Sequence, residues 1–168
     1  MPLLRNGRAD ADDPWVRLDD DAPLPSTATG RPAGLPESSP PAPVLLGLAR
    51  FLAEAAGGTV ATGVLLAPDD DPLVLAPYLG RLQLVAVDFP VYTDGRGYSH
   101  ARLLRERLGY GGEVRAIGDV RVDQLAFMVR AGFDTFDLVD EIDAATLHAA
   151  LSRYRTSYQP SYALAIAG

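Results

Sequence analysis

The chain has 168 residues and a formal net charge of −7, from 15 basic and 22 acidic residues. This acidic balance argues against nucleic acid and anionic membranes as partners, and no apolar run is long enough to span a bilayer. There is no cysteine and every basic residue is an arginine, so thiolate nucleophiles, disulfides within the chain and lysine Schiff bases are excluded. The first residues lack a signal-peptide pattern, and we therefore expect a cytoplasmic protein.

Residues 1–43 predict an extended N-terminal arm. Asn6-Gly7 is a strong turn signal, and residues 15–18 alternate apolar and polar side chains as a half-buried strand does. We expect residues 3–8 and 15–18 to form a small β-ribbon that Trp15 anchors on the main domain. Residues 19–43 are rich in Pro, Asp, Ser, Thr and Gly, a composition that predicts a disordered linker.

Residues 44–168 predict an α/β domain with a C-terminal tail. Residues 44–56 are almost continuously apolar, which we interpret as a buried helix. Strands and helices then alternate. Strands are expected at 63–67, 82–87, 114–117 and 135–139, and helices at 71–80, 98–108, 121–131 and 143–154. This alternation indicates right-handed crossovers and a parallel sheet, either a half-barrel or a small open sheet.

Polar side chains gather where two neighbouring strands give way to helices. The first junction, 88–99, contains Asp94-Gly95-Arg96-Gly97 and Ser99, and the second, 118–124, contains Asp119 and Arg121. Because the carboxyl ends of parallel strands meet at one edge of a sheet, we expect both junctions to line a common rim.

The segment Gly95-Arg96-Gly97 predicts an oxyanion site. Glycines let backbone N–H groups converge, the start of a helix adds positive potential, and the planar guanidinium of Arg96 matches phosphate, sulfate or sulfite. Asp94 would position the loop or the guanidinium. The structural alternative is a tight turn in which Ser99 caps the helix.

The second junction leaves similar alternatives open. Asp119 is either a general base, a partner that holds Arg96 or Arg121, or the cap of the following helix. His100 stands where a dinucleotide fingerprint needs its third glycine, so we expect no bound cofactor. The two histidines are far apart in sequence and show no metal-ligand spacing, so we expect no metal.

Several motifs together resemble one bacterial family. They are Phe89-Pro90, Asp94-Gly95-Arg96-Gly97-Tyr98-Ser99, Leu108-Gly109-Tyr110, Gly118-Asp119-Val120, Gly132-Phe133-Asp134 and Tyr158-Gln159-Pro160. The chain resembles the domain-of-unknown-function family DUF934 over most of its length outside 26–43. Members are usually encoded beside assimilatory sulfite reductase and phosphoadenylylsulfate reductase, and on that association they are described as probable oxidoreductases of sulfite reduction. Some relatives carry cysteine where Ala131 stands here, so this chain departs from any thiol mechanism.

Two functions of different class stay open. The resemblance implies an accessory protein of sulfate or sulfite reduction, with sulfite reductase or phosphoadenylylsulfate reductase as partner and a small oxyanion at the rim. The crowded polar rim is equally typical of a small α/β enzyme that acts on an anionic, phosphate- or sulfur-bearing substrate.

Overall fold

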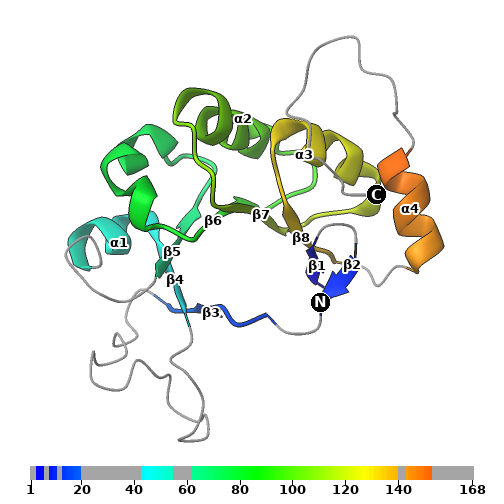
Figure 1. Cartoon of the computed structure of the whole chain (residues 1–168), viewed down its shortest axis with the longest axis horizontal. Helices are drawn as coiled ribbons and strands as arrows, with labels where there is room; N and C mark the ends of the chain where they lie inside the picture. The colour runs from blue at the N-terminus through cyan, green and yellow to red at the C-terminus, as the bar shows by residue number, and fades with distance from the viewer. Residues whose placement is uncertain are drawn as a thin grey trace, which may run out of the picture.

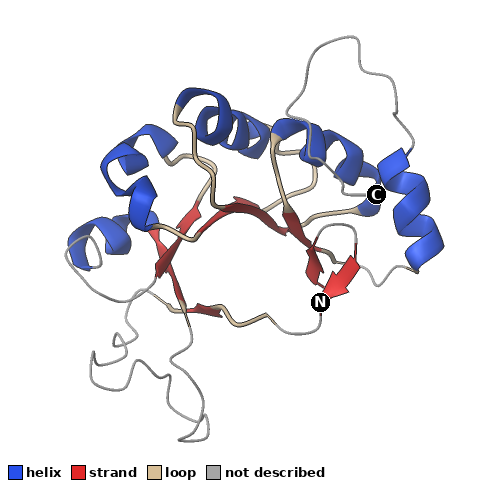
Figure 2. Ribbon diagram, viewed as in Figure 1, coloured by secondary structure: helices blue, strands red, loops and turns tan. Residues whose placement is uncertain are grey.

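The computed structural model describes residues 3–5, 8–10, 13–19, 43–54, 62–139 and 143–152. Within these ranges the chain forms one sheet in the order β2-β1-β8-β7-β6-β5-β4-β3. The six strands from β3 to β8 run parallel to one another, while β1 is antiparallel to both β8 and β2. The sheet curls into a half-barrel with the helices along its convex side (Figures 1 and 2).

The predicted α/β fold with parallel strands is confirmed, as a half-barrel that has two more parallel strands than the four expected. The strands are β1 (Leu3–Arg5), β2 (Arg8–Asp10), β3 (Val16–Arg17), β4 (Val44–Gly47), β5 (Thr62–Leu66), β6 (Leu84–Phe89), β7 (Glu113–Gly118) and β8 (Thr135–Asp137). The helices are α1 (Leu48–Glu54), the 3-10 helix η2 (Pro72–Arg81), α2 (Arg96–Arg102), the π-helical η3 (Leu103–Arg107), the 3-10 helix η4 (Val122–Gln124), α3 (Leu125–Ala131) and α4 (Ala144–Ser152).

The prediction of a single helix over 44–56 is wrong, because the segment begins with a strand. Strand β4 covers Val44–Gly47, and α1 follows at once with Leu48–Glu54. Val44, Leu45 and Leu46 are 0%, 5% and 0% exposed, so both faces of the strand are buried. A run buried on both faces has no polar period that distinguishes a strand from a helix.

The N-terminal residues supply strands to both edges of the sheet. A two-stranded ribbon forms, but from β1 and β2, with Leu3 opposite Asp10. The expected partner of that ribbon, β3, instead pairs in parallel with β4 at the far edge (Figure 1). The predicted linker between β3 and β4 falls largely in 20–42, and the predicted C-terminal tail in 153–168; both lie outside the described residues.

The convex face of the sheet carries the main core. Alternate residues of each strand, such as Val85, Val87 and Phe89 in β6, point toward the helices and are fully buried. The ring of Phe89 lies 5.5 Å from that of Tyr98 in α2 and 5.8 Å from that of Phe133, centroid to centroid. This aromatic contact joins the carboxyl end of β6 to the helical layer.

The concave face is covered by the segment just before β3. A small apolar cluster of Leu45, Leu65, Leu84 and Ala86 receives the indole of Trp15. The indole lies over Gly63, where a Cβ atom would stand 2.9 Å from the ring. Glycine is therefore required at residue 63 for the close approach of Trp15.

An ion-pair network completes this cover. Arg115 in β7 is 4% exposed, and its guanidinium donates to Glu113 Oε1 at 3.0 and 2.9 Å. It also pairs with Asp13 Oδ2 at 2.6 Å, across 102 residues of sequence. Thr135 donates to the same Glu113 oxygen at 2.7 Å. A buried guanidinium needs such partners, so Asp13 holds the N-terminal segment to the sheet.

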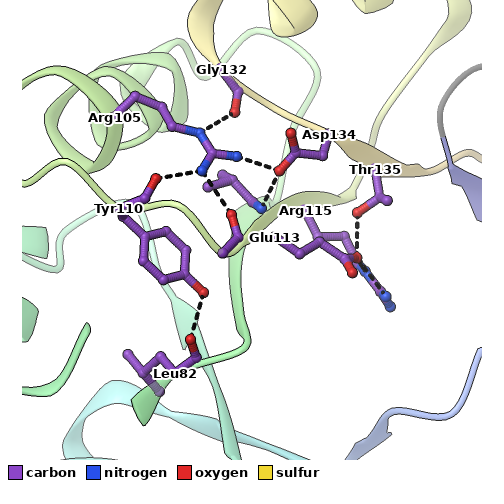
Figure 3. Close-up of polar contacts among 10 residues, drawn as sticks. Leu82, Arg105, Tyr110, Glu113, Arg115, Gly132, Asp134 and Thr135 are labelled. Atoms are coloured by element: carbon purple, nitrogen blue, oxygen red, sulfur yellow. Dashed lines mark hydrogen bonds and ion pairs between the residues drawn. The ribbon is translucent and has the colours of Figure 1, made fainter. Parts of the chain in front are cut away.

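A second buried arginine organises the amino ends of the central strands (Figure 3). Arg105 is 6% exposed and donates to the carbonyl oxygens of Gly132, Tyr110 and Gly112 at 2.9, 2.6 and 2.7 Å. It also pairs with Asp134, whose carboxylate accepts the N–H of Val114 at 2.8 Å. Burial nevertheless raises the pKa of Asp134. These contacts fix loops at the amino ends of the strands, whereas the polar rim lies at the carboxyl ends.

Replacing Gly63 with alanine tests the docking of Trp15, which is the only tryptophan in the chain. The new Cβ atom would meet the indole at 2.9 Å and Leu45 Cδ1 at 3.0 Å. We expect Gly63→Ala to lower the free energy of unfolding by about 1–3 kcal/mol and to shift tryptophan emission to longer wavelength. Gly80→Ala is the matched control, because a Cβ atom there meets nothing within 4 Å. Unchanged emission from Gly63→Ala would contradict the packing of Trp15 on β5.

Candidate functional site

The loops at the carboxyl ends of β5 and β6 carry a first group of rim charges, Arg96, Asp94 and Asp69. The guanidinium of Arg96 donates from Nε to Asp94 Oδ1 at 3.0 Å and from a terminal nitrogen to Asp94 Oδ2 at 2.7 Å. Its other terminal nitrogen pairs with Asp69. The side chain of Asp94 is 11% exposed and that of Asp69 is 91% exposed. Asp94 therefore fixes the guanidinium, whereas Asp69 approaches it from solvent.

The glycines and the serine of the predicted oxyanion site have separate local explanations. Gly95 is exposed with a φ of −87°, which any residue adopts. Gly97 is buried because a Cβ atom there would stand 2.5 Å from the Phe89 ring, so glycine lets α2 approach β6. Ser99 is exposed and does not cap the helix, since Asp94 Oδ1 accepts the N–H of Arg96 at 3.1 Å.

A second group of rim residues joins the two junctions. Asp119 accepts from Arg121 Nε at 2.9 Å and from the N–H of Tyr92 at 3.0 Å. The Tyr92 hydroxyl donates to Asp123 at 2.9 Å, and the Arg121 guanidinium lies 5.4 Å from the Tyr92 ring centroid. Asp119 therefore does not cap the next helix; its carboxylate positions the loop that contains Tyr92. The Arg121 guanidinium lowers the pKa of Asp119.

Both groups lie at the carboxyl ends of the strands, but they form two separate sets of polar contacts. Within the described residues no hydrogen bond or ion pair joins Arg96 to Asp119. Each of the two arginines contacts a neighbouring carboxylate, so the rim is not a cationic surface. An oxyanion at Arg96 would have to replace the contact with Asp69, because Asp94 is held by three hydrogen bonds from the guanidinium and one from the backbone.

A pocket of about 320 Å³ opens at the carboxyl ends of β3 to β6, and we refer to it as the mouth pocket. Its lining residues come from both sequence halves: Arg17, Leu18, Asp19, Gly47, Leu48, Ala49, Leu65, Ala67, Asp70 and Asp88. In this architecture ligands bind beyond the carboxyl ends of the strands. Among the described residues, the mouth pocket is therefore a candidate site for a bound small molecule.

Asp88 is the residue whose role sequence reasoning missed. It falls within the first predicted junction, 88–99, but it is not among the predicted site residues. It follows Leu84 and Ala86 at alternate positions of β6, so its side chain lies on the concave face and lines the mouth pocket. Burial raises the pKa of Asp88, and the charge of Arg17 opposes that rise. The sequence did contain a signal for this position. Alternate residues of a strand share one face, so a carboxylate at the end of the buried strand, two positions after Ala86, lies on the same face as Leu84 and Ala86.

Gly118 allows the loop after β7 to close against Asp88. Its φ is +96°, and a Cβ atom there would stand 2.4 Å from the Phe89 carbonyl oxygen and 2.8 Å from Asp88 Oδ1. The following N–H, of Asp119, donates to the Phe89 carbonyl at 2.7 Å. Glycine is favoured here by the left-handed backbone and by the lack of space.

The described residues contain neither a cluster suited to a metal ion nor a membrane-spanning helix. No group of three or more His, Cys, Asp or Glu residues is arranged to hold a metal ion there. None of the helices in the ranges given above has the length and apolar character needed to cross a lipid bilayer. His100 in α2 is 6% exposed, and burial lowers its pKa.

The contact between Arg96 and Asp94 predicts a measurable titration. Hydrogen bonds from the Arg96 side chain and backbone lower the pKa of Asp94 to about 2. In Arg96→Gln, NMR titration of the carboxyl carbons should show the Asp94 pKa rising toward the ordinary value of about 3.9. Because the ionised form is favoured in the folded state, its stabilising contribution is complete above the ordinary pKa. That contribution disappears as the pH falls through about 2.

Arg121→Gln is the control for this titration. It should leave Asp94 unchanged and raise the pKa of Asp119 instead, since Arg121 contacts Asp119. An Asp94 titration that is the same with and without Arg96 would show that the two side chains are not paired in solution.

Comparison with known proteins gives one family. A family model described as "Bacterial protein of unknown function (DUF934)" matches residues 63–165, more than half of the chain. The matched range contains both rim groups and Asp88, and it leaves out β3, β4 and α1. No curated protein matches the chain.

Proposed function

The chain belongs to the DUF934 family, and we propose that it is an accessory protein of assimilatory sulfate or sulfite reduction that binds a small oxyanion at Arg96. The observation that carries the oxyanion part is the state of this guanidinium. Asp94 orients it through two of its nitrogens, while the third pairs, among the residues that the structure describes, with the 91% exposed carboxylate of Asp69. A planar, oriented guanidinium with one nitrogen paired to an exposed, displaceable carboxylate is suited to sulfite, sulfate or phosphate.

The other rim donors lie beside this guanidinium in sequence. An oxyanion that displaces Asp69 would accept from Arg96, with the N–H of Gly97 and the hydroxyl of Ser99 as further donors. The N–H of Tyr98 is already used, since it donates to the Gly95 carbonyl at 3.2 Å. Asp94 would stay in place, and Asp119 with Arg121 would hold the loop of Tyr92.

The accessory role rests on chemistry and on the family resemblance. The chain has no cysteine for sulfur redox chemistry, and the rim carboxylates are engaged by arginines. The resemblance implies a partner among the reductases of sulfate assimilation. The protein would therefore bind the anion and present it to sulfite reductase or phosphoadenylylsulfate reductase, without a reaction of its own.

Deletion of the gene tests the pathway. We expect the deletion strain to grow poorly when sulfate or sulfite is the sole sulfur source, and cysteine to restore growth, because cysteine bypasses sulfite reduction. Growth curves on the three sulfur sources measure this. Normal growth on sulfate in a strain with no second copy of the gene would rule out the pathway.

Variants of Arg96 test the oxyanion site within that strain. Arg96→Ala should keep the thermal midpoint almost unchanged, because the Arg96 side chain itself is 53% exposed, yet fail to restore growth. Arg96→Lys should restore growth only in part, since an ammonium lacks the two-pronged geometry of a guanidinium. Arg102→Ala, which removes an exposed arginine from the same helix, is the control and should restore growth fully. Full growth with Arg96→Ala, or an unfolded Arg96→Ala protein, would make Arg96 a purely structural residue.

A second candidate function is a small enzyme that acts on an anionic phosphate- or sulfur-bearing substrate. The observation that favours it is the mouth pocket, in which a half-buried carboxyl group with a raised pKa lies near an arginine. Carboxyl groups of this kind serve as general acids or bases. In this case Asp88→Asn, and not Arg96→Ala, would abolish growth on sulfate.

A further inference from the structure

We propose that the mouth pocket binds a small zwitterion of the amino acid type, with its ammonium group at Asp88 and its anionic group at Arg17. This inference is independent of the oxyanion site at Arg96. It concerns the same pocket as the second candidate function, and it assigns to that pocket a ligand that carries an ammonium group as well as an anionic group.

Strand pairing brings the two charges to the same face. Arg17 in β3 is in register with Leu45, and Leu45 belongs to the concave cluster. Asp88 lies on the same face of β6, two positions beyond Ala86. Since residues in register on a parallel sheet point to the same side, both side chains project toward the concave space at the mouth.

The two charges face the pocket without neutralising each other. The charge of Arg17 acts on Asp88, since it lowers the carboxyl pKa against the larger effect of burial. Yet no ion pair joins Arg17 to Asp88 in the described part of the chain. Two opposite charges that line one cavity without an ion pair between them match a ligand that carries both charges, because each end of the ligand then has a partner.

The remaining lining explains why a singly charged ligand fits less well. Asp70 and Asp19 also line the pocket, so its lining carries more negative than positive charge and favours a ligand that brings an ammonium group together with its anionic group. Asp70 is fixed, because its carboxylate accepts the N–H of Ala67 at 2.7 Å. A cation alone would leave Arg17 without a ligand partner. A zwitterion supplies a partner both to Asp88 and to Arg17.

The size and the floor of the pocket suit a small aliphatic molecule. Its volume of about 320 Å³ lies at the lower end of the range for ligand sites. Leu48 and Leu65 are buried in its wall and Leu18 is partly exposed, so an apolar side chain would lie against these three leucines. An aliphatic amino acid combines these features.

Binding to the purified full-length protein tests the inference. The standard amino acids would be added one at a time at millimolar concentration, with NMR chemical shifts and calorimetry as readouts. For any amino acid that binds, the matched amine without the carboxylate and the matched acid without the amine would be titrated in parallel. We expect the zwitterion to bind roughly 10-fold or more tightly than either matched compound.

Two variants connect binding to the named charges. Arg17→Gln and Asp88→Asn should each weaken binding by roughly 10- to 100-fold. Asp88→Asn should keep or raise the thermal midpoint at neutral pH, because it removes a half-buried charge. Arg102→Gln and Glu106→Gln, which remove exposed charges outside the pocket, should bind as the unchanged protein does.

Three results would overturn the inference. The first is that no amino acid binds at millimolar concentration. The second is a matched amine or acid that binds as tightly as the zwitterion. The third is binding that neither Arg17→Gln nor Asp88→Asn weakens. Because the assay uses purified protein and does not involve Arg96, its failure is distinguishable from a failure of the growth tests.

Discussion

A half-barrel exposes its concave face unless another part of the molecule covers it, and the rest of this structure depends on how that face is covered. Here the cover is the segment of residues 13–17, held by the indole of Trp15 over Gly63 and by the ion pair of Asp13 with Arg115. A buried guanidinium left with one partner fewer is strongly unfavourable, so the ion pair specifies where the segment lies. Burial of the concave apolar cluster of Leu45, Leu65, Leu84 and Ala86 favours docking of this segment.

The amino ends of the strands carry structural contacts, whereas their carboxyl ends carry the candidate functional residues. At the amino ends of β6 to β8, Arg105 donates to three backbone carbonyl oxygens and pairs with Asp134. At the carboxyl ends, Arg96 and Arg121 are exposed and meet carboxylates from loops. Buried, fully bonded charges stabilise one arrangement, whereas exposed pairs exchange with solvent and ligands at little cost. A ligand site is therefore expected at the carboxyl ends of the strands and not at their amino ends.

Sequence patterns predicted the repeating strand–helix units well and the covering elements poorly. Alternation from 62 to 139 located β5 to β8, and α3 ends at residue 131 as predicted, followed by Gly132 with a φ of +109°. Strand β4 was missed because it is apolar on both faces. The pairing of β3 was missed because its partner, β4, lies beyond residues 20–42 of the sequence, and a local pattern does not encode so distant a partner. At the site, charge and glycine patterns located the rim loops, but the partners of Asp119 and the pocket at Asp88 depend on contacts between distant strands.

The cover of the concave face also completes the mouth pocket. Arg17 lines the pocket as part of β3, and β3 directly follows the residues that attach the segment to the concave face. Trp15, Asp13 and Arg17 thus act in one short segment: the first two attach it and the third supplies a charge to the pocket. A ligand that contacts Arg17 binds only the covered form, so binding and attachment of the segment must stabilise each other. The same six parallel strands therefore set both the stability of the N-terminal segment and the chemistry of the pocket.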